Sequence, residues 1–130
     1  FKRKLPKSLD RNDFSPDLVA GMELSDGART LAAMTARSIL GSAIHAQGEV
    51  SRWIICGGGR RNAAIMAEMV SGAKQAEVLI AEEAGFDGGA MEAEAWAYLA
   101  VRSLKGLPIT FPPTTGVKQP VTGGKLCRTA

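Results

Sequence analysis

Two short apolar runs constrain the fold of this chain more than any other feature. They are Arg52–Cys56 and Glu77–Ala81, and each is too short to form a stable helix. Runs of this length that contain β-branched residues are typical of buried strands. A segment with helical periodicity separates them, and strands that alternate with helices pair in parallel through right-handed crossovers. The sequence therefore predicts an α/β fold in which short parallel strands alternate with helices.

Three helices are expected around these strands, over residues 26–46, 62–71 and 88–105. Asp26 is a suitable N-cap for the first helix, and Gly106 terminates the third. Apolar residues that recur three or four positions apart define the face that each helix should bury. In chain order, these faces consist of Leu31, Thr35, Ile39 and Ala43; of Ile65, Met66, Met69 and Val70; and of Met91, Ala95, Tyr98, Leu99 and Arg102.

The same reading divides the chain into three parts. Residues 1–24 carry prolines and polar residues, so a connecting loop is expected there, with a short helical turn near residues 16–21. Residues 25–106 hold the predicted strands and helices. Residues 107–130 contain too many prolines and glycines for regular structure, and we expect an irregular tail. Because a two-stranded sheet leaves its edges open and the chain does not begin with Met, we expect it to be part of a longer protein.

The charge and cysteine patterns argue against several functions. Basic residues crowd the first eleven positions of a chain with net charge +3, but no aromatic residues are interleaved with them to stack on bases. Nucleic acid is therefore not an expected partner. Cys56 and Cys127 lack the spacing of a zinc site, and Cys56 is expected to be buried as a small apolar residue. Trp53 and Trp96 are expected to be core or half-buried residues.

Membrane insertion and secretion are not indicated either. No segment resembles a signal peptide, and no apolar stretch approaches the ~20 residues that a membrane-spanning helix requires. A reducing, cytoplasmic location fits this pattern best.

The glycine turn at Gly57, Gly58 and Gly59 is the first candidate functional feature, because it joins a predicted strand to a predicted helix. Glycines allow the backbone to approach a flat or charged ligand closely, since no Cβ atom intervenes. The N-terminus of the following helix favours a phosphate group or a polar edge. The turn nevertheless lacks the third glycine of the dinucleotide fingerprint and the Lys-Ser/Thr pair of a P-loop.

Two interpretations of this turn therefore remain open. In the first, the glycines contact a nucleotide, and Arg60 and Arg61 add positive charge near it. In the second, the segment is a tight connection between strand and helix, with Asn62 as the helix N-cap.

The start of the third helix carries a second candidate, formed by Glu92 and Glu94. Residues two apart on a helix point about 200° away from each other, so these carboxylates cannot act together on one substrate. At most one of them faces a site. Alternatively, both only favour the helix N-terminus electrostatically.

Taken together, several stretches resemble the anhydro-N-acetylmuramic acid kinase family, in the same order and over essentially the whole chain. The resemblance is most specific at CGGGRRN and MEAEAWAYLAVR, and looser elsewhere. The matching stretches are residues 7–14, 26–31, 56–62 and 85–100, followed by a family-like ending at 107–112 and 115–116.

The resemblance implies a fold and an activity. Members of this family belong to the sugar kinase, Hsp70 and actin superfamily, in which two ribonuclease-H-like domains surround a nucleotide cleft. They use ATP and Mg²⁺, with water, to convert 1,6-anhydro-N-acetylmuramic acid to N-acetylmuramic acid 6-phosphate in peptidoglycan recycling, and they form homodimers. This chain would be about the last third of such a kinase, mostly from its second domain, and its partner would be the missing N-terminal portion.

Site residues follow from the resemblance one at a time. Gly57, Gly58 and Gly59 correspond to the adenosine motif of the superfamily, and Asn62 to an asparagine at the same cleft. Glu92 corresponds to a family glutamate that reaches the sugar side of the cleft. Glu94 has no counterpart and is expected to be structural.

One departure from the family and one missing part limit this assignment. The family has an aspartate where this chain has Gly89, and Asp87 is expected to substitute for it in part. The phosphate-binding hairpin and the catalytic aspartate belong to the earlier sequence, so no catalytic residue and no metal ligand are expected here. The chain alone is therefore expected to be inactive. The alternatives are a degenerate or non-catalytic nucleotide-binding remnant, or another carbohydrate kinase of the superfamily.

Overall fold

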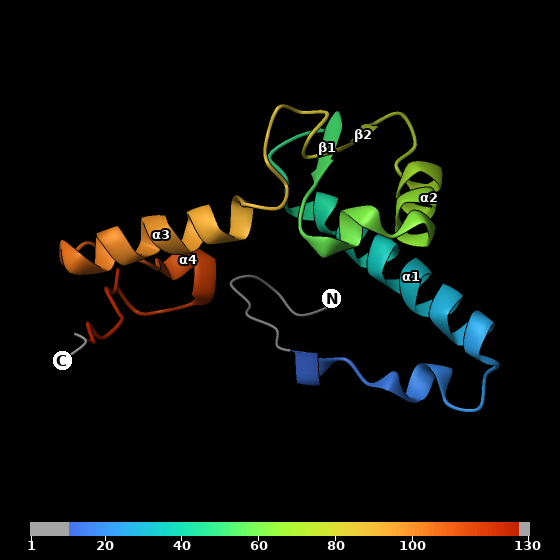
Figure 1. Ribbon diagram of the computed structural model, residues 1–130, viewed down its shortest axis with the longest axis horizontal. Coiled ribbons are helices and arrows are strands. Elements are labelled where there is room, and N and C mark those ends of the chain that lie inside the picture. Colours follow the sequence, from blue (N-terminus) through green and yellow to red (C-terminus); the bar gives the residue numbers. More distant parts are fainter. Residues whose placement is uncertain (1–10, 128–130) are drawn as a thin grey trace. The chain divides into compact units, whose positions relative to one another are not determined.

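The computed structural model describes residues 11–127, which form two compact units (Figure 1). The first unit comprises residues 15–91, and the second comprises residues 11–14 together with 92–127. The predicted division at 1–24, 25–106 and 107–130 stays a prediction.

The first unit is built on a parallel pair of short strands, β1 (Arg52–Ile55) and β2 (Glu77–Ile80). Trp53 lies opposite Val78 in the register, and Ile55 lies opposite Ile80. The connection between the strands contains a 3₁₀ turn and the helix α2, as the alternation of apolar runs predicts. The α/β fold and the parallel pairing are therefore confirmed.

Two helices accompany this sheet: α1 (Leu24–Gly41) and α2 (Ala63–Gly72). The N-cap of α1 is Glu23, so the prediction that Asp26 caps this helix is wrong. Asp26 instead lies in the first turn, where its charge favours the helix N-terminus. The helix also ends before residue 46, because its last turn tightens into the 3₁₀ helix η3 (Ser42–His45).

The core of this unit lies where α1, α2 and the sheet meet. Its buried members are Ala36, Ile55 and Met69. Partly buried residues pack around them, namely Ile39, Leu40, Trp53, Ile65, Met66 and Val78. The half-buried position expected for Trp53 is confirmed.

The buried face of α1 is one residue away from the predicted one. Ala32 and Ala36 are buried, whereas Leu31 and Thr35 are exposed. Alanine has no side chain beyond Cβ, so these positions allow α1 and α2 to approach closely. Ile39, which also belongs to the predicted face, packs against the core. On α2 the predicted face is correct except at Val70, which is exposed.

The second unit consists of α3 (Met91–Leu104) and the chain that folds back along it (Figure 1). The Arg102 guanidinium donates from Nε to the Pro108 carbonyl at 2.6 Å, and the Ser103 hydroxyl donates to the Gly123 carbonyl. The tail is mostly irregular, as predicted. It contains one helical turn, α4 (Pro112–Thr115), and one antiparallel bridge between Thr110 and Val121.

Trp96 on α3 differs from the prediction, because 65% of it is exposed. It lines an open hollow between α3 and the tail, together with Leu99 and Leu126. Two short 3₁₀ helices complete the description, η1 (Arg11–Asp13) in this unit and η2 (Pro16–Val19) in the first. The helical turn expected at residues 16–21 is confirmed by η2.

Truncation of Met69 tests this core. Met69→Ala should lower the free energy of unfolding by roughly 2–5 kcal/mol, because the Met69 side chain is fully buried and its truncation leaves a cavity in its place. Val70→Ala is the matched control on the same helix and should change it by less than about 0.5 kcal/mol. Urea unfolding of the 130-residue chain, followed by circular dichroism, measures both. Equal losses for the two variants would contradict the core described above.

Candidate functional site

The glycine turn begins directly after β1, and its three glycines have different structural roles. Gly57 has φ +71° and ψ −175°, a region that is essentially restricted to glycine. Gly58 and Gly59 enter the 3₁₀ helix η4 (Gly58–Arg61) and have no positive φ. A Cβ atom on Gly58 would meet nothing within 4 Å, and one on Gly59 would only touch Ile65 Cδ1 at 4.0 Å. The backbone therefore requires glycine at 57, whereas the packing of this chain does not require it at 58 or 59.

Asn62 joins this turn to α2 as its N-cap. Its side-chain Oδ1 accepts hydrogen bonds from the backbone N–H of Ala64 at 3.0 Å and of Ile65 at 3.2 Å. The expected capping role is therefore confirmed. Because Oδ1 is used in this way, the side-chain NH₂ group is the part of Asn62 that can donate to a ligand. That contact stays a prediction.

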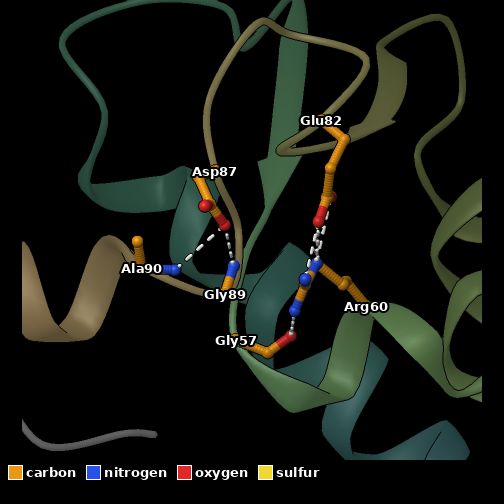
Figure 2. Close-up of polar contacts among 6 residues, drawn as sticks. All are labelled: Gly57, Arg60, Glu82, Asp87, Gly89 and Ala90. Atoms are coloured by element: carbon orange, nitrogen blue, oxygen red, sulfur yellow. Dashed lines mark hydrogen bonds and ion pairs between the residues drawn. The ribbon is translucent and has the colours of Figure 1, made fainter.

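Arg60 does not lie where the sequence interpretation placed it. Its guanidinium points back into the protein and donates to Glu82 from Nη2 at 2.6 Å and from Nε at 2.9 Å (Figure 2). Its Nη1 donates to the Gly57 carbonyl at 2.8 Å. Only 7% of Arg60 is exposed. Of the two interpretations of this turn, the one in which Arg60 adds positive charge near a nucleotide is not supported, because Glu82 already pairs with that charge.

The charges of this pair stabilise each other. The hydrogen bonds from Arg60, assisted by a backbone N–H, hold the pKa of the Glu82 carboxyl below its ordinary value. The same hydrogen bonds raise the pKa of the Arg60 guanidinium, against the effect of its burial. Both groups are therefore ionised at neutral pH.

The loop between β2 and α3 is shaped around this guanidinium. A Cβ atom on the buried Gly88 would lie 2.5 Å from Arg60 Nε and 3.0 Å from Ala81 Cβ, so only glycine fits there. Asp87 Oδ1 accepts from the backbone N–H of Gly89 at 2.8 Å and of Ala90 at 3.1 Å (Figure 2). Asp87 thus caps the turn that leads into α3.

Gly89 is the position at which the family resemblance implies an aspartate. Its backbone has no positive φ, so a side chain is compatible with its conformation. A Cβ atom there would lie 3.2 Å from Asp87 Oδ1 and 3.9 Å from Arg60 Nη2. An aspartate at this position would therefore bring a second carboxylate close to Arg60, beside the cap that Asp87 forms.

Glu92 and Glu94 both lie in the first turn of α3 and are exposed. This position agrees with the electrostatic interpretation, in which acidic residues favour a helix N-terminus. The assignment of Glu92 to a sugar-binding role stays a prediction, as does the absence of such a role for Glu94.

Cys56 is a further correction, since it is exposed rather than buried. It follows the last residue of β1, where the strand leaves the core for the glycine turn. The alternation of side chains along a strand places it on the face opposite the buried Ile55.

The first unit also has open hollows away from the glycine turn. An open hollow of about 980 Å³ is lined by Leu40, Trp53, Lys74 and their neighbours, before the amino ends of both strands. Among residues 11–127, no three His, Cys, Asp or Glu side chains gather in a way that could hold a metal ion. In the same part of the chain, no helix is long and apolar enough to cross a membrane.

Sequence reasoning missed two residues of the site, Glu82 and Gly88. A signal for Glu82 existed, because Arg60 and Glu82 each follow a predicted strand, and parallel strands bring their carboxyl ends together. No signal for Gly88 existed, because its close contact with Arg60 depends on the folded loop.

Comparisons with known proteins agree with this picture. The sequence profile of a family described as anhydro-N-acetylmuramic acid kinase matches residues 1–128. An anhydro-N-acetylmuramic acid kinase of Agrobacterium fabrum is 58% identical over 130 residues, which cover 98% of this chain and 35% of the relative. Kinases of the same name from Rhizobium etli and Brucella suis are 57% and 52% identical, over 97% and 95% of this chain and 34% of each relative. The chain thus spans about a third of the length of these curated relatives and matches their C-terminal part.

Substitution of the first two glycines separates their roles. Gly57→Ala should lower the free energy of unfolding by about 1–3 kcal/mol, because its φ of +71° strains any side chain. Gly58→Ala should leave it unchanged or slightly raised, because its Cβ atom enters open space and alanine restricts the unfolded chain. Thermal unfolding of the two variants measures the difference. A large loss in Gly58→Ala would show that packing, after all, requires this glycine.

The lowered pKa of Glu82 predicts an acid dependence of stability. A group whose pKa is lowered on folding stabilises the folded state above its unfolded-state pKa, near 4.5, and loses this contribution as the pH falls through the folded-state value. Glu82→Gln should therefore lower the urea midpoint at neutral pH, and its deficit should shrink as the pH falls below 4.5. Urea titrations of both proteins across this range measure the deficit. A deficit that grows in acid would contradict the assignment.

Proposed function

This chain belongs to the anhydro-N-acetylmuramic acid kinase family, and we propose that it forms the C-terminal, nucleotide-contacting part of such a kinase. The whole enzyme would use ATP and water to convert 1,6-anhydro-N-acetylmuramic acid to N-acetylmuramic acid 6-phosphate. The product would enter peptidoglycan recycling in the cytoplasm. The names of the curated relatives support the proposal: they are anhydro-N-acetylmuramic acid kinases, and each is about three times as long as the segment that matches this chain.

The proposal rests on Gly58 and Gly59, because the packing of this chain does not require glycine at either position. Gly58 and Gly59 lie after the carboxyl end of a parallel strand, the edge at which α/β sheets bind ligands. Side chains are missing there, although a Cβ atom on Gly58 would meet only open space. A nucleoside lying flat against this backbone would account for both glycines, because a Cβ atom would hold it away.

Other residues of the chain would contribute binding rather than chemistry. Gly57 would set the shape of the turn, and the NH₂ group of Asn62 would donate to the nucleotide. Glu92 would accept hydrogen bonds from the sugar, since an ionised carboxylate only accepts. The base that activates water would come from the remaining two thirds of the enzyme. The chain alone would therefore turn over no substrate.

The described residues would suit the nucleoside part of ATP but include no group of ligands for Mg²⁺. The glycine turn fits the nucleoside part of ATP, as argued above. Phosphoryl transfer also needs a metal ion that bridges phosphate oxygens. Within residues 11–127 no carboxylate cluster suited to a metal ion is present, so no step of this proposal is assigned to a metal ion held by this chain. A homodimer, which the family resemblance implies, is part of the proposal for the whole enzyme.

A chimera provides the test. This chain would replace the matched C-terminal segment of the Agrobacterium fabrum kinase, a conservative exchange at 58% identity. The chimera should phosphorylate 1,6-anhydro-N-acetylmuramic acid with ATP and Mg²⁺, whereas the 130-residue chain alone should not. Gly58→Ala in the chimera should raise KM for ATP by about tenfold or more without loss of stability, because its Cβ atom would meet only the nucleotide.

The outcomes separate the alternatives. An inactive chimera that gains activity with Gly89→Asp would favour the degenerate remnant, in which the aspartate has been lost. A chimera that phosphorylates a different sugar would favour another carbohydrate kinase of the superfamily. An unchanged KM for ATP in Gly58→Ala would remove the glycine turn from the nucleotide site.

A further inference from the structure

We propose that Arg60 is a positioning residue, which holds the backbone of the glycine turn in the conformation that binds the nucleotide by tying it to the loop after β2. This inference rests on the proposed function. It differs from the expected role of a basic residue at such a turn, which would be to contact the phosphates directly.

The contacts of Arg60 connect two loops that are far apart in sequence. Nη1 donates to the carbonyl of Gly57, in the loop after β1. Nη2 and Nε donate to Glu82, in the loop after β2, 22 residues away in sequence (Figure 2). A guanidinium holds its donors in a rigid plane, so this fork fixes the two loops relative to each other. A single lysine ammonium could not reproduce that geometry.

The side-chain bond to Gly57 strengthens the hold on its carbonyl, which otherwise accepts a long backbone bond from the Arg60 N–H at 3.4 Å. Because Gly57 has no side chain, its backbone could adopt many other φ and ψ combinations besides the positive φ seen here. In a trans peptide the carbonyl and the next N–H point in opposite directions. By holding the Gly57 carbonyl, Arg60 therefore fixes the whole plane of the Gly57–Gly58 peptide, which is the backbone that would face the nucleoside.

A second ion pair joins the same two strands and shows what is particular to Arg60. Arg52 Nε and Glu77 Oε2 lie 2.7 Å apart at the amino ends of β1 and β2. Both of these side chains are about half exposed, at 57% and 50%. In the other pair Glu82 is 44% exposed, and only the Arg60 side chain, at 5%, is buried. Exposed pairs contribute little, since water competes for them. The buried Arg60 also packs against Gly88, which has no room for a side chain.

Loss of Arg60 should therefore act on nucleotide affinity. When the binding-competent conformation is only partly populated, the apparent dissociation constant rises in inverse proportion to the fraction of molecules that hold it. A turn freed from Arg60 would sample other conformations of Gly57 before ATP binds. The chemical step would be affected less, because Arg60 touches neither ATP nor sugar in this proposal.

The chimera described above allows a direct test by calorimetry with a non-hydrolysable ATP analogue and by steady-state kinetics. Arg60→Met should raise the dissociation constant of the analogue by about tenfold or more, with kcat at saturating ATP within about threefold. Arg60→Lys should fall between Arg60→Met and the unmutated chimera, because it keeps the charge without the fork. Arg52→Met, the control at the other end of the strands, should change neither value.

Every outcome decides the question. A lower melting temperature in Arg60→Met with unchanged analogue affinity would make Arg60 merely structural and overturn the proposal. If Arg60→Met does not fold, Arg60→Lys and Glu82→Gln replace it: weaker binding supports positioning, and unchanged binding overturns it. An unmutated chimera that binds the analogue but phosphorylates no sugar would sink the kinase proposal alone, since the affinity comparison still stands. A chimera that binds no analogue overturns both.

Discussion

The candidate site depends on the hydrogen bonds that the buried guanidinium of Arg60 donates. This guanidinium has one partner in each of the two loops that follow the parallel strands, the Gly57 carbonyl and the Glu82 carboxylate. Without it, Gly88 would adjoin an empty space, and two neutralised charges would become one unpaired carboxylate at the loop edge. The glycine turn and the loop after β2 are thus shaped around one side chain.

The scaffold beneath this site is small, and its composition explains how it holds together. Alanines at the buried positions of α1 let that helix approach α2, and Met69 fills the remaining space. Only two strands form the sheet in the described part of the chain. The curated relatives are about three times as long as the matched segment, which accords with a scaffold that supports one side of a site rather than a whole one.

The fold could be predicted from the sequence because its signals are local. The apolar runs located both strands to within one residue, and the asparagine after the glycines identified the cap of α2. The buried face of α1 was misplaced because alanine gives a weak periodic signal beside leucine and isoleucine. Trp96 was expected to be a core or half-buried residue, but a large side chain becomes buried only where a partner packs against it. The Arg60–Glu82 pair could not be read locally, since it depends on strand pairing across 22 residues.

The central claim is that the glycine turn, held by Arg60, lies against the nucleoside. A crystal structure of the chimera with a non-hydrolysable ATP analogue tests it most directly. We expect the adenosine to lie flat on Gly58 and Gly59, while Arg60 keeps its bonds to Gly57 and Glu82. An adenosine bound elsewhere, with both glycines facing solvent, would contradict it. So would an Arg60 that leaves Glu82 to contact the phosphates.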